Sequence, residues 1–263
     1  MLEKNKMLKK LTIYELKKTW KQYALMCVII LVAGLFLGVF QIPRMAYDHS
    51  MNDNIHNIAN IITTLYMMFI PSMLVLITVS LSKRYYKSLY MSEGYFSFTL
   101  PASITEVVSS KHLAGGVLMM AGMVATYISC FFALIIGDGQ AKDITLYDVV
   151  EWFIMALVFM ALAIVNLVVC NLSVTVGRLW TKHKLLGNVL CFGCLWTVIG
   201  IVAAIANYIM TEIACLVTPG PSYVWPEEAA YVIFAVDFIC AGVLCYILDR
   251  VSIAITERTL NLD

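Results

Sequence analysis

The chain has 263 residues, of which 61% are hydrophobic and 13% charged, and its formal net charge is +1. A soluble globular domain carries about 25% charged residues, so this composition excludes one, and the near-neutral charge gives no reason to expect a nucleic-acid partner. An all-α membrane protein is predicted, because each apolar run exceeds or nearly matches the ~20 residues that a helix needs to cross the hydrocarbon core. The six runs are 22–42, 57–82, 113–137, 149–176, 186–211 and 230–248.

Residues 1–21 are basic and are predicted to form an interfacial helix, separate from a six-span domain over 22–263. On a helix, Met7, Leu8 and Leu11 fall on one arc, and most of the lysines fall on the opposite arc. Such a helix lies along the inner membrane surface with its lysines near anionic head groups of the lipid bilayer. The plainer alternative is a segment that only sets the topology.

The distribution of Lys and Arg predicts the orientation of the chain. Sixteen of the eighteen lie before residue 22, in 83–112, in 177–185 and after residue 248, whereas the remaining loops hold Arg44 and Lys142. Cytoplasmic loops are enriched in Lys and Arg. Both termini and the two basic loops are therefore expected on the cytoplasmic side of a cell membrane.

Two features of the first two runs bear on helix packing. Gly34 and Gly38 form a G-x-x-x-G pattern, which permits close approach of helices and is also common by chance in apolar segments. Pro71 lies near the middle of the second run, where it is expected to kink the helix or free a backbone carbonyl. The second half of the chain has no equivalent proline, which disfavours an inverted-repeat secondary transporter.

The loop 83–112 is the most unusual part of the sequence, because it holds more aromatic and apolar side chains than a solvated linker needs. The second helix is expected to continue through Tyr90 and to break at Gly94. Ser103 and Glu106 have the spacing of a capping box, which predicts a new helix there. Aromatic residues in such a loop indicate either a protein interface or an aromatic belt at the membrane surface.

The sequence LYMSEGYFSFTLPAS, followed by SSKHL, resembles the loop between spans two and three in the permease subunits of exporter-type bacterial ABC transporters, the type-2 permease family. The order of parts is also similar: a basic N-terminal helix, six spans and both ends inside. The likeness covers nearly the whole chain in architecture but only this loop in motif. The residues that carry the motif are Leu89, Tyr90, Glu93, Gly94, Tyr95, Leu100, Pro101 and Lys111.

The resemblance implies that this loop docks on cytosolic ABC ATPase subunits and couples their closure to the spans. It further implies a second permease subunit, identical or homologous, ATP and Mg²⁺ bound by the partner ATPase, and an amphipathic cargo such as an antimicrobial peptide or drug, or small cations. A secondary transporter and a membrane sensor or assembly subunit are the alternatives. The residues expected to couple are Tyr86, Leu89, Tyr90, Glu93, Gly94, Tyr95, Phe96, Leu100 and Pro101.

Three polar residues inside the apolar runs are candidates for a substrate path: Asn166, Asn207 and Asp237. Asp237 lies seven residues beyond Ala230, hence roughly 10 Å deep, and an ionisable residue at such depth usually faces the bundle interior or an aqueous cavity. A hydrogen-bonded packing role is the alternative. The outer segment 213–229 is where the short re-entrant helices of the family would lie.

The sequence carries no motif for catalysis or metal binding. It lacks a G-x-x-x-x-G-K-[ST] phosphate loop, H-E-x-x-H and G-x-S-x-G, so the chain is predicted not to be an enzyme. Its histidines lie outside the apolar runs and are never paired at helical spacing. Cys191 and Cys194 form a C-x-x-C within an apolar run, and we interpret them as packing residues.

Overall fold

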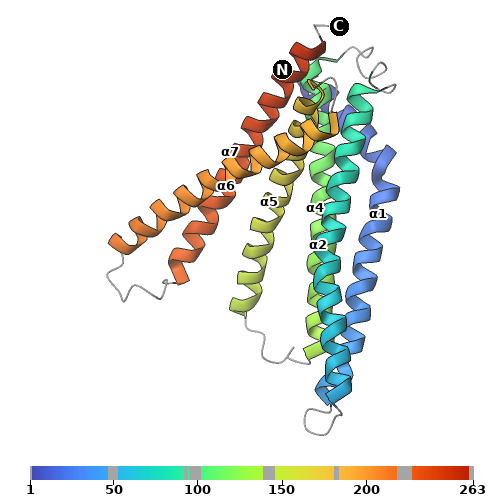
Figure 1. The fold of residues 1–263 in the computed structure, drawn as a ribbon, viewed down its shortest axis with the longest axis vertical. Coiled ribbons are helices and arrows are strands. Elements are labelled where there is room, and N and C mark those ends of the chain that lie inside the picture. Colours follow the sequence, from blue (N-terminus) through green and yellow to red (C-terminus); the bar gives the residue numbers. More distant parts are fainter. Residues whose placement is uncertain are drawn as a thin grey trace.

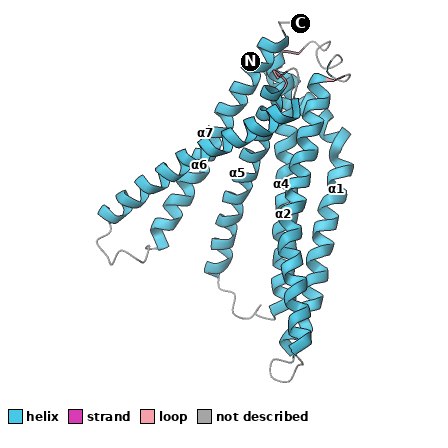
Figure 2. Cartoon of the chain, in the orientation of Figure 1, coloured by secondary structure: helices cyan, strands magenta, loops and turns pink. Residues whose placement is uncertain are grey.

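Six long α-helices make up the computed structural model, which describes residues 2–46, 53–91, 94, 102–138, 146–180, 184–217 and 227–260 (Figures 1 and 2). No β-strand occurs in these ranges, and each helix holds an apolar window long enough to cross a membrane. The predicted all-α fold of a six-span, multi-pass membrane protein is confirmed. The helices are α1 (Leu2–Ala46), α2 (Asp53–Tyr90), α4 (Ile104–Asp138), α5 (Leu146–Gly177), α6 (Lys184–Val217) and α7 (Glu227–Leu260).

Helix α1 is continuous across residue 21, where the sequence predicts the junction between the interfacial helix and the first span. The helix has 45 residues and is therefore ~67 Å long at 1.5 Å per residue. Residues 2–33 contain neither Gly nor Pro, so nothing in this stretch stops the helix. Leu11 and Leu16 pack against buried side chains of the other helices. The basic N-terminal segment is thus the first part of the helix that contains the first span.

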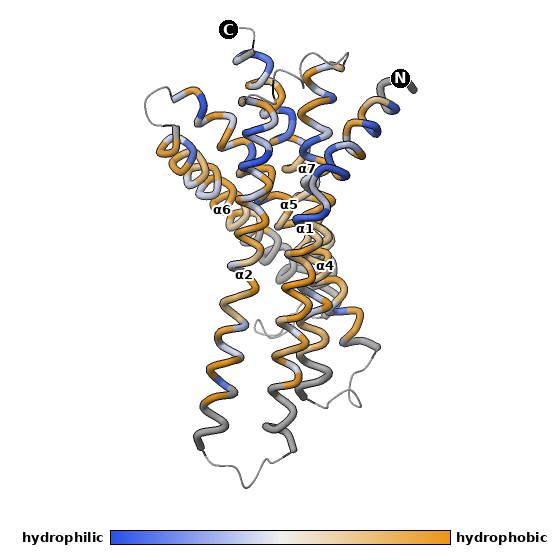
Figure 3. Tube along the Cα trace, turned by 90° about the vertical axis from the view of Figure 1, so that its right-hand side faces the viewer, coloured by the Kyte–Doolittle hydropathy of each residue, from blue (hydrophilic) through white to orange (hydrophobic). Residues whose placement is uncertain are grey.

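The helices converge at the end of the molecule where both termini lie (Figure 1). From there α1, α2 and α4 stay together, whereas α6 and α7 diverge from them toward the other end. Hydrophilic residues are concentrated at the end with the termini, and the helices below it are largely apolar (Figure 3). Half of the apolar window of α4 is buried, but none of that of α6. Helix α4 is therefore the central helix of the bundle.

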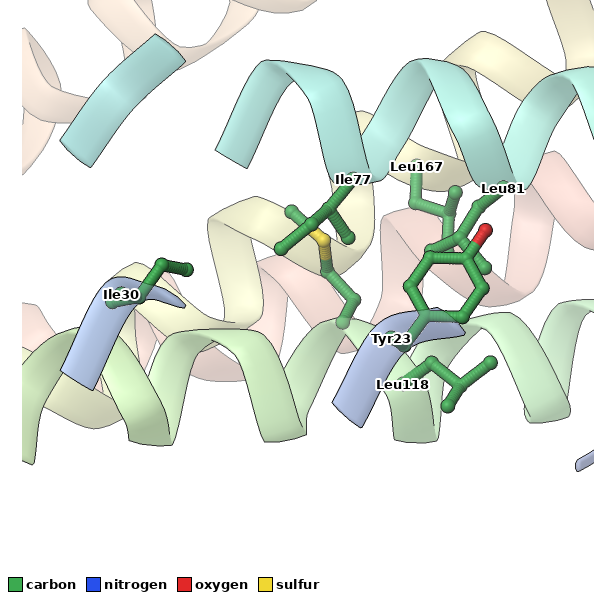
Figure 4. Packing of buried hydrophobic residues seen from close by; sticks show 7 residues of the cluster. Tyr23, Ile30, Ile77, Leu81, Leu118 and Leu167 are labelled. Atoms are coloured by element: carbon green, nitrogen blue, oxygen red, sulfur yellow. The ribbon is translucent and has the colours of Figure 1, made fainter. Parts of the chain in front are cut away.

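The main apolar core joins four helices, α1, α2, α4 and α5. Tyr23 on α1 lies beside Leu81, Leu118 and Leu167, which come from the three other helices (Figure 4). A second cluster joins α5 to α7 through residues such as Val169. Burial of these side chains fixes the helices relative to one another next to the polar residues described below.

Helices α1 and α4 approach each other closely at Gly34. A Cβ at this position would overlap the Ser129 side chain and lie 2.8 Å from its Cα. The Ser129 hydroxyl donates to the backbone oxygen of Ile30 at 2.8 Å, and the Tyr66 hydroxyl on α2 lies 2.8 Å from the same Ser129 oxygen. The first glycine of the G-x-x-x-G pattern therefore packs against a helix of its own chain.

Pro71 lies inside α2, and the helix continues on both sides of it.

Candidate functional site

A group of polar and charged side chains lies among the helices at the end with the termini, and several of its members belong to the two arms of the predicted loop 83–112. We call this group the polar layer. Its members come from five helices, and most of them are buried or half-buried. They are Glu15 on α1, Arg84, Tyr85 and Tyr90 on α2, Lys111 and His112 on α4, Asn171 and Thr175 on α5, and Asp249, Ser252 and Thr256 on α7.

An ion-pair cluster joins α1, α2 and α4 in this layer. The Lys111 ammonium lies 2.6 Å from Glu15 Oε1, and the Arg84 guanidinium lies 3.6 Å from Glu15 Oε2. The side chain of Lys111 is only 7% exposed. A buried ammonium is costly unless it is paired and hydrogen-bonded, so Glu15 is what allows Lys111 to lie in the bundle. Through Lys111, the N-terminal part of α1 is joined to the start of α4.

A histidine and a carboxylate join α4 to α7. His112 Nδ1 lies 2.5 Å from Asp249 Oδ1, and the Ser109 hydroxyl donates to Asp249 Oδ2 at 3.2 Å. The His112 ring stacks on the Tyr85 ring, with the centroids 5.1 Å apart and the planes 13° from parallel. The contact therefore holds three helices, because Tyr85 belongs to α2.

Hydroxyl groups at the end of α2 bind it to α5 and α7. The Tyr85 hydroxyl lies 3.1 Å from Ser252 Oγ, and the Tyr90 hydroxyl lies 3.0 Å from Thr256 Oγ1. Tyr90 also donates to Thr175 Oγ1 on α5 at 3.3 Å. The end of α2, which is the first arm of the predicted coupling loop, is thus tied to two helices.

The predicted coupling residues fall into two groups. Leu89 is fully buried against Val108 and Ile253, and the Tyr90 hydroxyl faces α5 and α7. Both therefore hold the base of the loop on the bundle. Tyr86 is half-exposed, and its ring centroid lies 5.8 Å from the ring centroid of Tyr90. Glu93, Tyr95, Phe96, Leu100 and Pro101 lie outside the described residues.

Gly94 lies where only a residue without a side chain fits. Its N–H donates to Met91 O at 2.8 Å, and a Cβ at Gly94 would overlap the backbone oxygen of Leu89. The chain therefore turns tightly back on the end of α2. This close approach explains a glycine at the position where the sequence predicts the break.

Both hydrogen bonds of a capping box lie at the start of α4. The Ser103 N–H donates to Glu106 Oε2 at 2.9 Å, and the Glu106 N–H donates to Ser103 Oγ at 3.3 Å. Two N–H groups that the helix leaves without a partner are satisfied in this way. The second arm of the loop thus begins as a fixed helix.

Replacing Ser103 with alanine is expected to destabilise the start of α4 by about 1 kcal/mol. Amide hydrogen exchange measured on the full chain in detergent micelles should then be about fivefold faster over residues 104–107, since 1.4 kcal/mol is a factor of ten. Ser103→Thr keeps the side-chain acceptor and serves as the matched control. Equal exchange in the alanine and threonine variants would mean that the cap does not hold this end of α4.

The three candidates for a substrate path have different surroundings. Asn166 accepts a hydrogen bond from Trp196 Nε1 at 3.3 Å, which joins α5 to α6. Asp237 is half-exposed on α7. The side chain of Asn207 lies outside the described part of the chain, as does most of the segment 213–229 between the end of α6 and the start of α7. Asn166 therefore makes the helix–helix contact that the sequence left open as its alternative.

Within the described ranges we observe neither a metal-binding group nor a disulfide. No group of three His, Cys, Asp or Glu side chains there lies close enough to hold a metal ion. Cys191 and Cys194 are free thiols. Glu15, Arg84, Lys111 and Asp249 make contacts between helices instead.

Sequence reasoning missed most of the polar layer. It set the histidines aside because none is paired at helical spacing, yet His112 meets Asp249 across 137 positions of the chain. Glu15 carried a signal in the sequence, because it is a carboxylate among the lysines of the first helix. Three-dimensional packing was needed to identify the partners. No protein-family model matches the chain, and neither a curated protein nor a solved structure matches it.

Proposed function

We propose that the chain is the transmembrane permease subunit of an ATP-driven ABC exporter in the plasma membrane of a bacterium. It pairs with a second permease subunit and with two cytosolic ATPase subunits, which bind ATP and Mg²⁺ and carry out the hydrolysis. The cargo is an amphipathic molecule such as a peptide or a lipophilic drug. The chain itself catalyses no reaction.

The observation that carries this proposal is the construction of the loop at the end with the termini. Its first arm ends on Leu89 and Tyr90, which are packed into the bundle, and its second arm begins at the capped start of α4. A loop held at both arms transmits a push to α2 and α4 as a rigid body. This is the property that a coupling element requires, and the sequence of the loop resembles one.

The polar layer transmits the same movement from α2 and α4 to α7. Tyr85 and Tyr90 link α2 to α7 through Ser252 and Thr256, and His112 links α4 to α7 through Asp249. Helices α6 and α7 diverge from α1, α2 and α4 at the far end (Figure 1). A small tilt at the polar layer therefore becomes a larger displacement at the far ends of these helices.

In this proposal the ATPase contacts the exposed side of the loop. Met91 is 54% exposed, and Tyr86 is half-exposed. Tyr86 lies between the polar-layer residues Tyr85 and Tyr90, and Met91 directly follows Tyr90. In this proposal Leu89 and Tyr90 transmit the movement inside the bundle, whereas Tyr86, Met91 and the aromatic residues that follow make the docking surface.

Gentle affinity purification of the full chain from its native membrane tests the proposal. We expect a P-loop ATPase to co-purify in a stoichiometric amount and to hydrolyse ATP. In the double variant Tyr86→Ser and Met91→Ser, the amount of bound ATPase should fall by about tenfold or more. The reason is that aromatic and apolar anchors at an interface each contribute over about 1 kcal/mol. The fraction of ATPase retained on the affinity resin measures this loss.

The control is Tyr14→Ser, which changes an aromatic side chain that is 63% exposed on α1 toward the same end of the bundle. This variant should retain the ATPase. If the wild-type chain purifies folded and without an ATPase, the permease proposal fails. A secondary transporter or a membrane sensor would then be the better account.

A further inference from the structure

A small cavity lies within the polar layer, between α1, α2, α4 and α5. It has about 30 Å³ of free space and is partly open to the surroundings. Its charged lining residues are Glu15, Arg84 and Lys111, and Asn171 adds an amide. A cavity of this size is large enough to hold a water molecule or a small polar group.

The charges that line the cavity do not balance. Within the described part of the chain, Arg84 and Lys111 share one carboxylate, that of Glu15. Asp249 does not line the cavity, and its two oxygens are engaged by His112 and Ser109. A positive charge shielded from water is costly unless an anion accompanies it. The lining therefore favours a negatively charged ligand.

The lining also supplies hydrogen-bond donors for an anion. An ammonium has three donors, and Lys111 is bonded to one Glu15 oxygen. Asn171 is only 2% exposed, and its Oδ1 has no hydrogen-bond partner among the described residues. Asn171 lines the cavity, and because its terminal torsion is roughly two-fold, a half-turn exchanges the positions of its oxygen and its NH₂ group. Arg84 adds a planar fork that matches phosphate oxygens.

The cavity lies at the level where lipid head groups are expected. Arg84 lies two residues after the end of the second apolar run, and Lys111 lies two residues before the start of the third. The exposed lysines Lys18 and Lys83 lie on the same stretches of α1 and α2. Basic residues at the membrane surface attract anionic lipids. The expected source of an anion at this position is therefore the membrane.

We propose that this cavity binds a phosphate group, supplied by the head group of an anionic lipid. Lys111 and Arg84 neutralise the phosphate, and the Asn171 amide donates to one of its oxygens. Inorganic phosphate offers the same chemistry from solution. The site is independent of the proposed transport function, because it requires only that the bundle lies in a membrane.

Native mass spectrometry of the full chain, released from neutral detergent micelles, tests this site. The chain is titrated with dioleoyl phosphatidylglycerol and, separately, with dioleoylglycerol, which has the same acyl chains and no phosphate. We expect the phosphate-bearing lipid to bind about tenfold more tightly, in keeping with one strong charge-assisted contact. Equal binding of the two lipids would overturn the lipid assignment.

Three variants separate a binding site from general surface charge. Arg84→Gln should weaken binding of phosphatidylglycerol by about tenfold, whereas Lys83→Gln removes the same charge from an exposed neighbour and should change it less than about twofold. Glu15→Gln removes the competing carboxylate and should strengthen binding. Weaker binding in Glu15→Gln, or an equal loss in the Arg84 and Lys83 variants, would contradict the site.

Inorganic phosphate distinguishes the two sources of the ligand. At millimolar concentration it should displace phosphatidylglycerol only weakly from the wild-type chain, because it lacks the acyl chains. If inorganic phosphate raises the unfolding temperature of the wild type but not of Arg84→Gln, while phosphatidylglycerol fails to bind, the lipid assignment is wrong. The ligand is then a soluble anion.

Discussion

Replacing Lys111 with methionine is expected to lower the free energy of unfolding by about 3 kcal/mol, because removing one partner of a buried ion pair leaves the other charge uncompensated. Methionine keeps an unbranched apolar stem of similar length, so the change isolates the ammonium group. Glu15 would keep its contact with Arg84, whose guanidinium is 3.6 Å away and whose side chain is 27% exposed. Denaturant unfolding of the full chain in mixed micelles measures the effect.

Two further variants show whether the ion pair is the cause. Adding Glu15→Gln to Lys111→Met removes the uncompensated charge and should recover most of the lost stability, because replacing both partners is often nearly neutral. Lys83→Met removes a charge from an exposed position on α2 and should change stability by less than about 0.5 kcal/mol. If Lys111→Met and Lys83→Met behave alike, Glu15 and Lys111 do not hold α1 to α4.

Replacing Gly34 with alanine is expected to have the second large effect, a loss of about 2 kcal/mol of stability, within the range measured for overpacked cores. The new Cβ would lie 2.5 Å from the backbone oxygen of Ser129 and 2.8 Å from its Cα. Backbone atoms cannot rotate out of the way, so α1 and α4 must separate. That separation lengthens the bond from Ser129 to Ile30, which connects the two helices.

The control for this variant is Gly116→Ala on α4. A Cβ at Gly116 would meet nothing within 4 Å, so alanine should be neutral or should stabilise the helix by up to about 1 kcal/mol. Both variants are measured by the same denaturant unfolding. Equal stability of the two variants would contradict the close approach of α1 and α4.

The helices were predictable because their signal is local. A helix satisfies its own backbone hydrogen bonds in the hydrocarbon core, so a long apolar run is sufficient to identify each span. The capping box of α4 was predictable for the same reason, since Ser103 and Glu106 are three positions apart. The pattern at Gly34 identified a position of close helix packing, but not Ser129 as its neighbour.

The polar layer was not predictable, because its contacts are distant in the sequence. Glu15 and Lys111 are 96 positions apart, and His112 and Asp249 are 137 apart. In the sequence alone, the basic residues near the membrane boundary indicate only the topology. Packing of the helices then placed two of them, Arg84 and Lys111, around one carboxylate. Which acid meets which base depends on the order of helices in the bundle.

The boundary of α1 illustrates a limit of helical periodicity. The arc formed by Met7, Leu8 and Leu11 is the same for a helix at the membrane surface and for a helix that packs on a bundle. Leu11 contacts the cluster formed by α2, α4 and α7. The apolar arc is thus partly a packing face. Periodicity alone does not say which surface an apolar arc covers.

Cross-linking from the end of α2 in the native membrane tests the central claim most directly. A photoreactive group is placed at Met91, which is 54% exposed, and in a control chain at Leu65, which is 61% exposed but lies within the apolar part of α2. We predict that Met91 yields an adduct with a P-loop ATPase, that Leu65 does not, and that trapping the ATPase with ATP and vanadate changes the adduct yield. If Met91 forms no ATPase adduct in a membrane where the chain is folded, the loop is not a coupling element and the chain is not an ABC permease.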